Sequence, residues 1–346
     1  MKMFVTGATG LLGSNLVRAL RAEGHSVRAL VRSKEKAQRQ LGDTGVELVV
    51  GDMEDVPGFV DALGGAEVVF HTAAYFREYY AAGDHWPKLE AINIRGTLAL
   101  AEAARARGVK RLVDTSSSGT IGLKPDGSPG DEETPPAPLA MGNLYFKSKV
   151  LAAEQLRALA ARTGLDVVHV LPGWMFGPSD AAPTGSGQLV LDFLAGKLPA
   201  IPPGGTSVVD ARDVAVGMIR AAERGRAGEK YILSGDFVTL AEVIRMLEQV
   251  TGRSGPRVRI PYPVAFAYAA VSETWAKLTG GKTLVTLKGV RMLQARLAVT
   301  SAKAERELGW KHRPFRETLA DEVTWYRDQG FATEPAARAA VAARAR

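Results

Sequence analysis

The most constraining feature of the sequence is a glycine-rich turn close to its start. Gly7, Gly10 and Gly13 follow an apolar run over residues 2–6 and open an amphipathic stretch over 11–23. Glycines at this spacing allow a tight turn between a strand and a helix, and they let an anion approach the N–H groups at the helix start. In this context the motif predicts a site for the pyrophosphate of a dinucleotide; the alternative is an ordinary glycine turn.

Short β-rich runs alternate with longer helical patterns through the first half of the chain. Such alternation is typical of a parallel sheet covered by helices on both faces. We therefore expect an α/β fold: a Rossmann doubly wound parallel sheet with a smaller, mostly helical C-terminal substrate lobe. The expected strands are 2–6, 26–31, 47–50, 67–71, 111–115 and 166–171, and the expected helices include 11–23, 92–107 and 144–163.

The sequence pattern changes near residue 172, because prolines interrupt the chain frequently from there on. We expect the dinucleotide-binding domain to span 1–171 and about 207–235, because 207–209 and 230–233 resemble strands that return to the sheet around a helix beginning near Asp213. The substrate lobe then takes about 172–206 and 236–330, and 331–346 form a tail. Within the lobe, Thr239 and Glu242 are spaced as a capping box, and Gly252 ends that helix.

The residues after the second expected strand indicate which dinucleotide binds. A cofactor without a 2′-phosphate usually meets an acidic residue there. This sequence has Arg32 and Ser33 instead, and a guanidinium pairs well with a phosphate. We therefore favour NADP(H) over NAD(H); the alternative is a surface arginine at a helix start. Asp52, after the third strand, is equally suited to accept a hydrogen bond from the exocyclic amine of adenine or to cap a turn.

Tyr145 and Lys149 lie one helical turn apart, so their side chains share a face. An ammonium near a phenol lowers the pKa of the phenol from about 10 and makes it usable as a general acid or base. The alternative is a surface lysine beside a half-buried tyrosine. Ser116, Ser117 and Ser118 favour the chemical interpretation, because they follow a strand at the ligand-binding edge of the sheet. Spacing alone does not choose among the three serines.

Composition excludes several kinds of site. The chain has no cysteine, so disulfides, thiolate nucleophiles and Cys-ligated metals are absent, and its histidines show no pairing at ligand spacing. We expect no metal. The net charge of +7 is spread among acids, which argues against a nucleic-acid partner. The apolar stretch 260–270 contains two prolines and is shorter than the roughly 20 residues of a membrane span. We expect a cytoplasmic protein.

Together these features resemble the extended short-chain dehydrogenase/reductase superfamily, also called the NAD-dependent epimerase/dehydratase superfamily. The resemblance covers nearly the whole chain and is strongest to the dihydroflavonol-reductase-like branch, with further similarity to hopanoid-associated sugar epimerases. The motifs that carry it are the glycine turn, Gly51 with Asp52, residues 71–74, Asn93 with Gly96, residues 145–149, residues 171–173, Gly177 with Pro178, and residues 308–310.

The resemblance implies a role for each site residue. Ser117 is the catalytic serine, Tyr145 donates the proton, Lys149 also holds the nicotinamide ribose, and Asn93 helps to position a water relay. It also implies a homodimer formed through the helices that contain Asn93 and Tyr145. The cofactor-binding residues are expected to be Gly7, Thr9, Gly10, Leu11, Leu12, Gly13, Arg32, Ser33, Asp52, Met53, Ala73, Ala74, Tyr145, Lys149, Pro172, Gly173 and Met175.

Two departures from the family pattern bear on the substrate. Ser118 and Gly119 stand where sugar-nucleotide dehydratases carry an Asp-Glu pair, and Leu171 stands where many members carry arginine. Aromatic side chains instead offer a wall for a hydrophobic carbonyl compound, although packing between lobe and sheet explains any one of them equally well. The expected substrate residues are Tyr75, Phe76, Ser118, Trp174 and Phe176, with Tyr79 and Tyr80 nearby.

These observations favour an NADPH-dependent reductase that transfers hydride to a ketone or aldehyde of a small, hydrophobic substrate. The first alternative is a nucleotide-sugar epimerase, in which a tightly bound NAD(P) is reduced and reoxidised within one turnover. The second is an NADP-binding redox sensor that regulates a partner protein. Such sensors tend to lack the reacting residues, whereas Ser117, Tyr145 and Lys149 are all present here.

Overall fold

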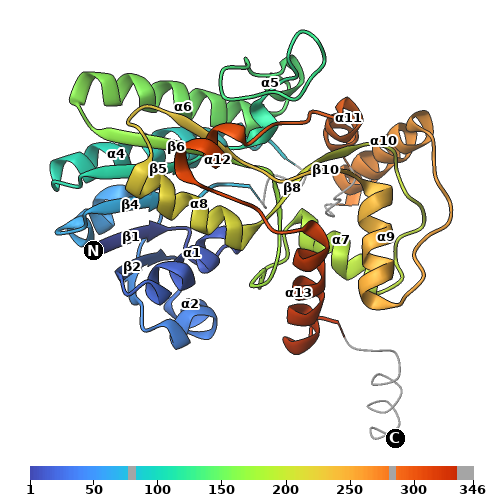
Figure 1. Cartoon of the computed structure of the whole chain (residues 1–346), viewed down its shortest axis with the longest axis horizontal. Coiled ribbons are helices and arrows are strands. Elements are labelled where there is room, and N and C mark those ends of the chain that lie inside the picture. The colour runs from blue at the N-terminus through green and yellow to red at the C-terminus, as the bar shows by residue number, and fades with distance from the viewer. Residues whose placement is uncertain (77–82, 280–285, 333–346) are drawn as a thin grey trace, which may run out of the picture.

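The computed structural model describes residues 1–76, 83–279 and 286–332. Its centre is a parallel sheet with the strand order β3-β2-β1-β4-β5-β6-β9 (Figure 1). The order reverses between β1 and β4, and in open α/β sheets this is where ligands bind. The strands are β1 (Lys2–Thr6), β2 (Ser26–Val31), β3 (Glu47–Val50), β4 (Val68–His71), β5 (Arg111–Thr115), β6 (Asp166–Pro172) and β9 (Lys230–Leu233).

Two apolar layers cover this sheet. One joins α1 (Leu11–Ala22) and α8 (Ala211–Arg224) to the strands and extends to α2 (Lys34–Leu41) and α12 (Ala302–Leu308). The other layer packs η2 (Val56–Leu63), α4 (Thr97–Ala106) and α6 (Leu144–Thr163) on the opposite face. Shorter elements complete this domain: η1 (Gly42–Thr44), α3 (Trp86–Leu89), η4 (Glu90–Gly96), η5 (Ser118–Thr120) and α5 (Pro138–Met141).

The lobe contains a small sheet of its own, in the order β10-β8-β7. Its core joins β7 (Trp174–Phe176), β8 (Gly205–Asp210) and β10 (Phe237–Thr239) to α7 (Gly185–Leu194), α9 (Leu240–Thr251) and α13 (Phe315–Asp328). Two further helices, α10 (Tyr262–Thr279) and α11 (Leu287–Ala295), share a separate small cluster at one end of the molecule (Figure 1). The lobe is mostly helical, as the sequence predicts.

Most strand bounds agree with the sequence to within one residue, but one expectation about the sheet is wrong. Residues 230–233 return to the main sheet as β9, whereas 207–209 lie in β8 of the small sheet. Gly173 N donates to Leu233 O (3.1 Å) where β6 ends, and the chain then pairs β7 with β8 outside the main sheet. The capping box is confirmed, since Glu242 N donates to Thr239 Oγ1 (3.2 Å) and Thr239 N donates to Glu242 Oε2 (2.7 Å).

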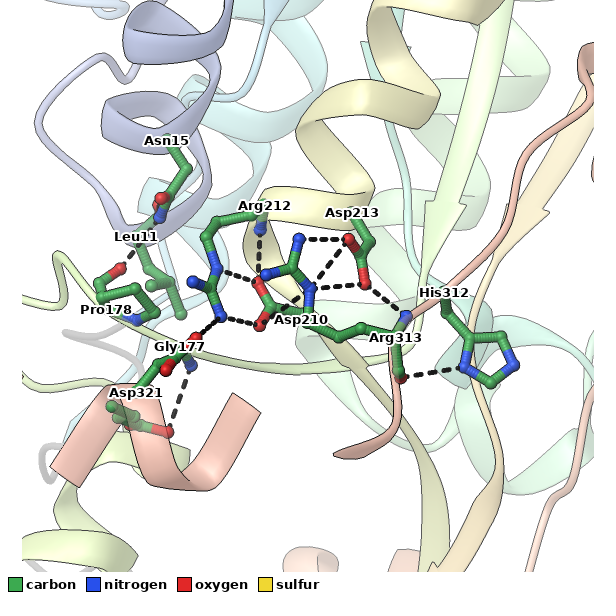
Figure 2. A network of polar contacts seen from close by, with 11 residues as sticks. Leu11, Asn15, Gly177, Pro178, Asp210, Arg212, Asp213, His312, Arg313 and Asp321 are labelled. Carbon is green, nitrogen blue, oxygen red and sulfur yellow. Dashed lines mark hydrogen bonds and ion pairs between the residues drawn. The ribbon is translucent and has the colours of Figure 1, made fainter. Parts of the chain in front are cut away.

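A polar network fixes the lobe to the nucleotide domain (Figure 2). At the start of α8, two arginines form ion pairs with aspartates. Arg313 Nη2 lies 2.6 Å from Asp213 Oδ1, and Arg212 Nη2 lies 2.7 Å from Asp210 Oδ2. Arg212 also reaches Asp321 of α13 at 2.7 Å. Burial alone would lower the pKa of Arg212, but the two carboxylates outweigh it and raise that pKa. The N-terminus of α8 therefore holds the segments that lead into and form α13.

Replacing Arg313 by methionine leaves the Asp213 carboxylate largely buried without its ion pair. We expect the R313M variant to lose about 2 kcal/mol of unfolding free energy, measured by urea denaturation. Arg316 lies exposed in the first turn of α13, three residues further along the chain, so R316M is the matched control and should change stability by less than about 0.5 kcal/mol. Equal stability of the two variants would show that the Arg313 to Asp213 pair does not fix the lobe.

His71 ends β4 and lies buried beneath the ligand-binding edge of the sheet. Its Nδ1 lies 2.8 Å from Thr6 Oγ1, and its Nε2 lies 2.9 Å from Thr97 Oγ1. Burial lowers the pKa of His71 from 6.5 to about 4; nearby Asp114 opposes this shift, and Lys149 adds to it. The folded chain therefore keeps this imidazole neutral at pH values where the unfolded chain protonates it.

This difference predicts a dependence of stability on pH. Between about pH 6.5 and pH 4 the unfolded state binds the proton and the folded state does not, so the unfolding free energy falls as the pH falls. The loss attributable to His71 amounts to about 3 kcal/mol across that window. In H71Q, which cannot titrate there, urea denaturation should show a correspondingly flatter profile. Parallel profiles for the two proteins would contradict the assignment.

Candidate active site

A single cleft of about 1920 Å³ opens at the carboxyl edge of the main sheet and continues into the lobe. Pockets for one small ligand usually measure about 300 to 1,000 Å³, so this cleft has room for an extended cofactor and a substrate together. All seventeen residues expected to bind cofactor line it: Gly7, Thr9, Gly10, Leu11, Leu12, Gly13, Arg32, Ser33, Asp52, Met53, Ala73, Ala74, Tyr145, Lys149, Pro172, Gly173 and Met175.

The glycine turn forms a cradle that side chains would fill. Gly7 has φ +66°, and a Cβ there would lie 2.6 Å from Ala73 N. A Cβ on Gly13 would lie 2.2 Å from Gly7 O. Within the described part of the chain no side chain caps the start of α1 at Gly10, so its first N–H groups are available to an anion. The cradle fits the pyrophosphate of a dinucleotide.

Cations gather at the far end of the cradle. Arg32, which directly follows β2, and Lys36 and Arg39, which lie three residues apart on α2, all line the cleft there. The Ser33 hydroxyl accepts from Lys36 N (3.3 Å) and so caps α2. The sequence analysis singled out Arg32 and Ser33 but missed Lys36 and Arg39, although their helical spacing was a usable signal. Asp52 lines the cleft, and its Oδ1 also accepts from Glu54 N (3.0 Å), so one oxygen serves the turn.

Tyr145 and Lys149 reach the middle of the cleft from the first turns of α6. The side chain of Asn143 accepts from Tyr145 N (3.0 Å) and fixes where this helix begins. Lys149 is buried, and its Nζ donates to Thr115 O (2.7 Å) at the end of β5. Burial lowers the pKa of Lys149, and the charge of Asp114 opposes that shift. The ammonium is therefore held in place between the strand and the cleft.

The structure distinguishes the three serines that follow β5. Ser116 and Ser118 are buried, whereas Ser117 is only half-buried, and all three line the cleft. The Ser117 hydroxyl accepts from Gly119 N (3.2 Å), which leaves its proton available to a ligand oxygen. Gly119 is required beside it, because a Cβ there would lie 2.6 Å from the Phe146 ring. Ser117, Tyr145 and Lys149 thus share the cleft that the cradle occupies.

Asn93 lies behind the cleft wall instead of on it. It belongs to the π-helical segment η4, and π-helical turns are frequent near functional sites. Its Oδ1 accepts from Tyr75 N (2.7 Å), and its Nδ2 donates to Ser148 Oγ (3.0 Å) and Tyr75 O (3.3 Å). Asn93 therefore acts as a positioning residue that ties the segment after β4 to α6. The predicted water relay stays a prediction.

The aromatic wall is only partly as expected. Phe76 packs against Tyr145 with ring centroids 4.7 Å apart, and Tyr75 and Trp174 also line the cleft. The expectation for Phe176 is wrong: this side chain is fully buried in the lobe core, 5.0 Å from the Phe315 ring. β7 belongs to the small sheet, which directs Phe176 into that core. Tyr79 and Tyr80 lie outside the described residues.

A buried contact between a carboxylate and an imidazole beneath the site was not anticipated. Asp114 Oδ2 lies 3.0 Å from His169 Nδ1, with both side chains almost fully buried in β5 and β6. Burial alone would raise the pKa of Asp114, but His169, with smaller contributions from Lys149 and His71, holds it below its ordinary value. Asp114 is thus a buried negative charge behind the Lys149 ammonium. A charged residue inside an apolar strand was the available signal.

The lobe half of the cleft is largely apolar. Its described cationic lining residues are Lys197 and Lys288, while Asp192 is an acid on the same wall. The remaining surface comes mainly from aliphatic side chains. Examples are Leu189, Leu198, Ile201, Ile244, Val264 and Leu293.

Comparisons with known proteins agree with this geometry. The sequence model described as the NAD dependent epimerase/dehydratase family matches residues 3–234. The chain is 35% identical to Sterol demethylase protein B of Methylococcus capsulatus, covering 96% of this chain and all of the relative. It is 34% identical to a Putative dihydroflavonol 4-reductase of Synechocystis sp., covering 95% of each. A nucleoside-diphosphate-sugar epimerase structure from Pseudomonas aeruginosa superposes with a TM-score of 0.77 at 28% identity, covering 96% of this chain and 99% of that one.

The family model spans well over half of the chain, and both relatives extend the match into the lobe. Family members bind NAD(P) and work as reductases and epimerases. The chain therefore belongs to the NAD dependent epimerase/dehydratase family of extended short-chain dehydrogenases/reductases and is an enzyme of the NAD(P)-dependent oxidoreductase type.

Proposed function

We propose that the protein is an NADPH-dependent reductase that acts on a ketone or aldehyde of a hydrophobic substrate. The observation that carries the proposal is the continuity of one cleft from the glycine cradle, past Ser117, Tyr145 and Lys149, to an apolar wall in the lobe. The bound cofactor would supply hydride at the point where the two halves of the cleft meet.

The residues of the chain would orient and protonate the substrate oxygen. The hydroxyls of Ser117 and Tyr145 would each donate a hydrogen bond to it, and Tyr145 Oη would pass its proton to that oxygen as negative charge develops. The Lys149 ammonium, held by Thr115 O at 2.7 Å, would stabilise the phenolate that remains. Asn93 would keep Tyr75 in place beside them through its 2.7 Å contact.

The choice of NADPH rests on charge. Arg32, directly after β2, and Lys36 and Arg39 of α2 are cations that line the cleft. A 2′-phosphate there would gain charge-assisted hydrogen bonds that a ribose hydroxyl cannot make as strongly. Asp52 lines the same cleft, and its carboxylate is suited to accept a hydrogen bond from the exocyclic amine of adenine.

The choice of a hydrophobic substrate is based on the apolar side chains that line the lobe half of the cleft. Desolvating a diphosphate against aliphatic side chains is unfavourable unless cations compensate for it, whereas an apolar carbonyl compound gains from the same surface. The relatives named for sterol demethylation and dihydroflavonol reduction support this class.

An epimerase is the second candidate, and two observations favour it. The nucleoside-diphosphate-sugar epimerase structure covers nearly the whole chain, and Lys197 and Lys288 supply positive charge in the lobe half of the cleft. Net consumption of NADPH with an added carbonyl compound supports the reductase. Isomerisation of a nucleotide sugar without net cofactor turnover supports the epimerase.

Tyr145→Phe removes the proton donor and keeps the ring that packs on Phe76. We expect kcat for NADPH-dependent reduction, measured on a panel of hydrophobic ketones and aldehydes, to fall by about 10² to 10⁴. NADPH binding, measured by titration calorimetry, should change little. Tyr262→Phe, the same change at the start of α10, is the control and should leave kcat intact. Undiminished turnover in Y145F would refute the role of Tyr145.

Arg32→Ala tests the cofactor preference. Losing one charge-assisted contact to the 2′-phosphate should weaken NADP⁺ binding by about ten-fold or more, because such a contact contributes about 1.5 to 3 kcal/mol. NAD⁺ binding should be nearly unchanged. Lys34→Ala is the matched control. Lys34 is an exposed cation at the first position of α2, and it does not line the cleft. A loss of equal size for both nucleotides would argue against recognition of the phosphate by Arg32.

A further inference from the structure

The outer face of α10 exposes its large apolar side chains. Val264, Tyr268, Val271, Trp275 and Leu278 are between 49% and 78% exposed. They recur at i, i+4, i+7, i+11 and i+14, so they form one stripe along the helix. We call these five residues the α10 stripe. Large apolar side chains normally face the core in a helix that stands in water, so this face is built for a non-aqueous contact.

The inner face of α10 is occupied and carries small residues. Ala265 and Ala269 are buried with Val290 of α11 in one cluster. Glu273 is bound as well, since its Oε1 accepts from Leu287 N (2.7 Å) at the start of α11. α10 therefore already packs on the protein through its inner face, and the α10 stripe is a second apolar face on the same helix.

The sequence around α10 is strongly basic. Between residues 249 and 302 the sequence contains eight basic residues and a single acid, Glu273. Of the described ones, Arg257, Arg259, Lys288, Arg291 and Arg296 are exposed. Arg257 contacts Glu248 at 3.5 Å, and the Arg291 guanidinium lies over the Phe266 ring at 5.1 Å. An exposed apolar stripe on so basic a segment complements a surface that is apolar inside and anionic at its edge.

The stripe is continuous with the cleft. Val264 and Tyr268 are its first two members, and both also line the cleft. The other three members lie further along α10, which stands with α11 at one end of the molecule (Figure 1). Whatever covers the stripe therefore also lies against the mouth of the cleft.

We propose that the α10 stripe docks on the surface of a lipid bilayer that contains anionic lipids. Its apolar side chains would enter the boundary between headgroups and acyl chains, where Trp and Tyr are favoured, and the neighbouring basic side chains would meet the headgroups. The contact is peripheral, because none of the described helices combines the length and the apolar character needed to cross a bilayer. A cleft that opens at this contact receives its ligand directly from the lipid phase.

A second copy of the chain fits the stripe less well. A symmetric dimer centred on α10 would bring the same basic segment of each copy toward the other. Like charges across an interface are unfavourable, whereas anionic headgroups neutralise them. The proposal goes beyond the reductase and does not depend on it, since docking is measured without turnover.

The test uses the full chain with NADP⁺ and vesicles of phosphatidylcholine, either alone or mixed with phosphatidylglycerol. We expect flotation with the mixed vesicles, weaker flotation with phosphatidylcholine alone, and loss of binding as salt shortens the Debye length from about 10 Å at 0.1 M to about 3 Å at 1 M. The double variant V271S/W275S should bind the mixed vesicles at least ten-fold more weakly. W275F keeps an apolar ring and is the matched control, which should bind within about two-fold of the parent.

A second readout locates the contact. Phospholipid brominated in the acyl chain should quench part of the tryptophan fluorescence of the parent, and W275F should bind while losing that part of the quenching. Circular dichroism and NADP⁺ binding establish that the variants fold. Three results overturn the proposal: no binding by the parent, equal binding by V271S/W275S, or a concentration-dependent doubling of mass in sedimentation equilibrium that this variant abolishes, which would assign the stripe to a second copy.

Discussion

The nucleotide cradle depends on a close approach of backbones that tolerates no side chain. Gly13 lies so near the carbonyl of Gly7 that a Cβ would stand 2.2 Å away, and a Cβ on Gly7 would stand 2.6 Å from Ala73 N in the segment after β4. This contact brings the start of α1 between β1 and β4, where the strand order reverses. A methyl group at either position would push the helix away from the sheet and fill the space intended for phosphate.

A second constraint is the burial of charge beneath the reacting residues. Lys149, His71 and Asp114 lie in or under the carboxyl edge of the sheet, and the pKa of each is set by opposing effects of desolvation and of neighbouring charges. Asp114 favours the charged form of the lysine, while burial disfavours it. In so dry a setting each group depends on its neighbours, because a lone buried charge is strongly unfavourable.

Local structure could be predicted from the sequence because each strand of the main sheet is a short apolar run that ends at a glycine or polar turn. The strands 2–6, 26–31 and 111–115 begin and end as expected. What failed was the assignment of a run to a sheet. Residues 207–209 have strand character, but so short a run does not indicate whether it pairs with a strand of the main sheet or with β7 of the small sheet. Phe176 was misplaced for the same reason, since its surroundings follow from the small sheet.

The site itself was predictable where spacing and chemistry act along one helix or turn. Tyr145 with Lys149 and the three glycines are of this kind. Asn93 is different: its partners, Tyr75 and Ser148, come from segments far apart in the chain, and its π-helical surroundings have no signature in a single sequence. Asp114 and His169 were visible as polar residues in apolar strands, but their pairing follows only from the parallel register of β5 with β6.

One hydrogen bond links the two halves of the molecule at their most sensitive point. Asn15, in the second turn of α1, donates to the carbonyl of Pro178 at 2.9 Å, shortly after the strand whose Met175 lines the cleft (Figure 2). A displacement of the lobe would therefore pull on the helix whose first turn faces the pyrophosphate. The helix start at the glycine cradle and the lobe that lines the other half of the cleft are thus tied together directly.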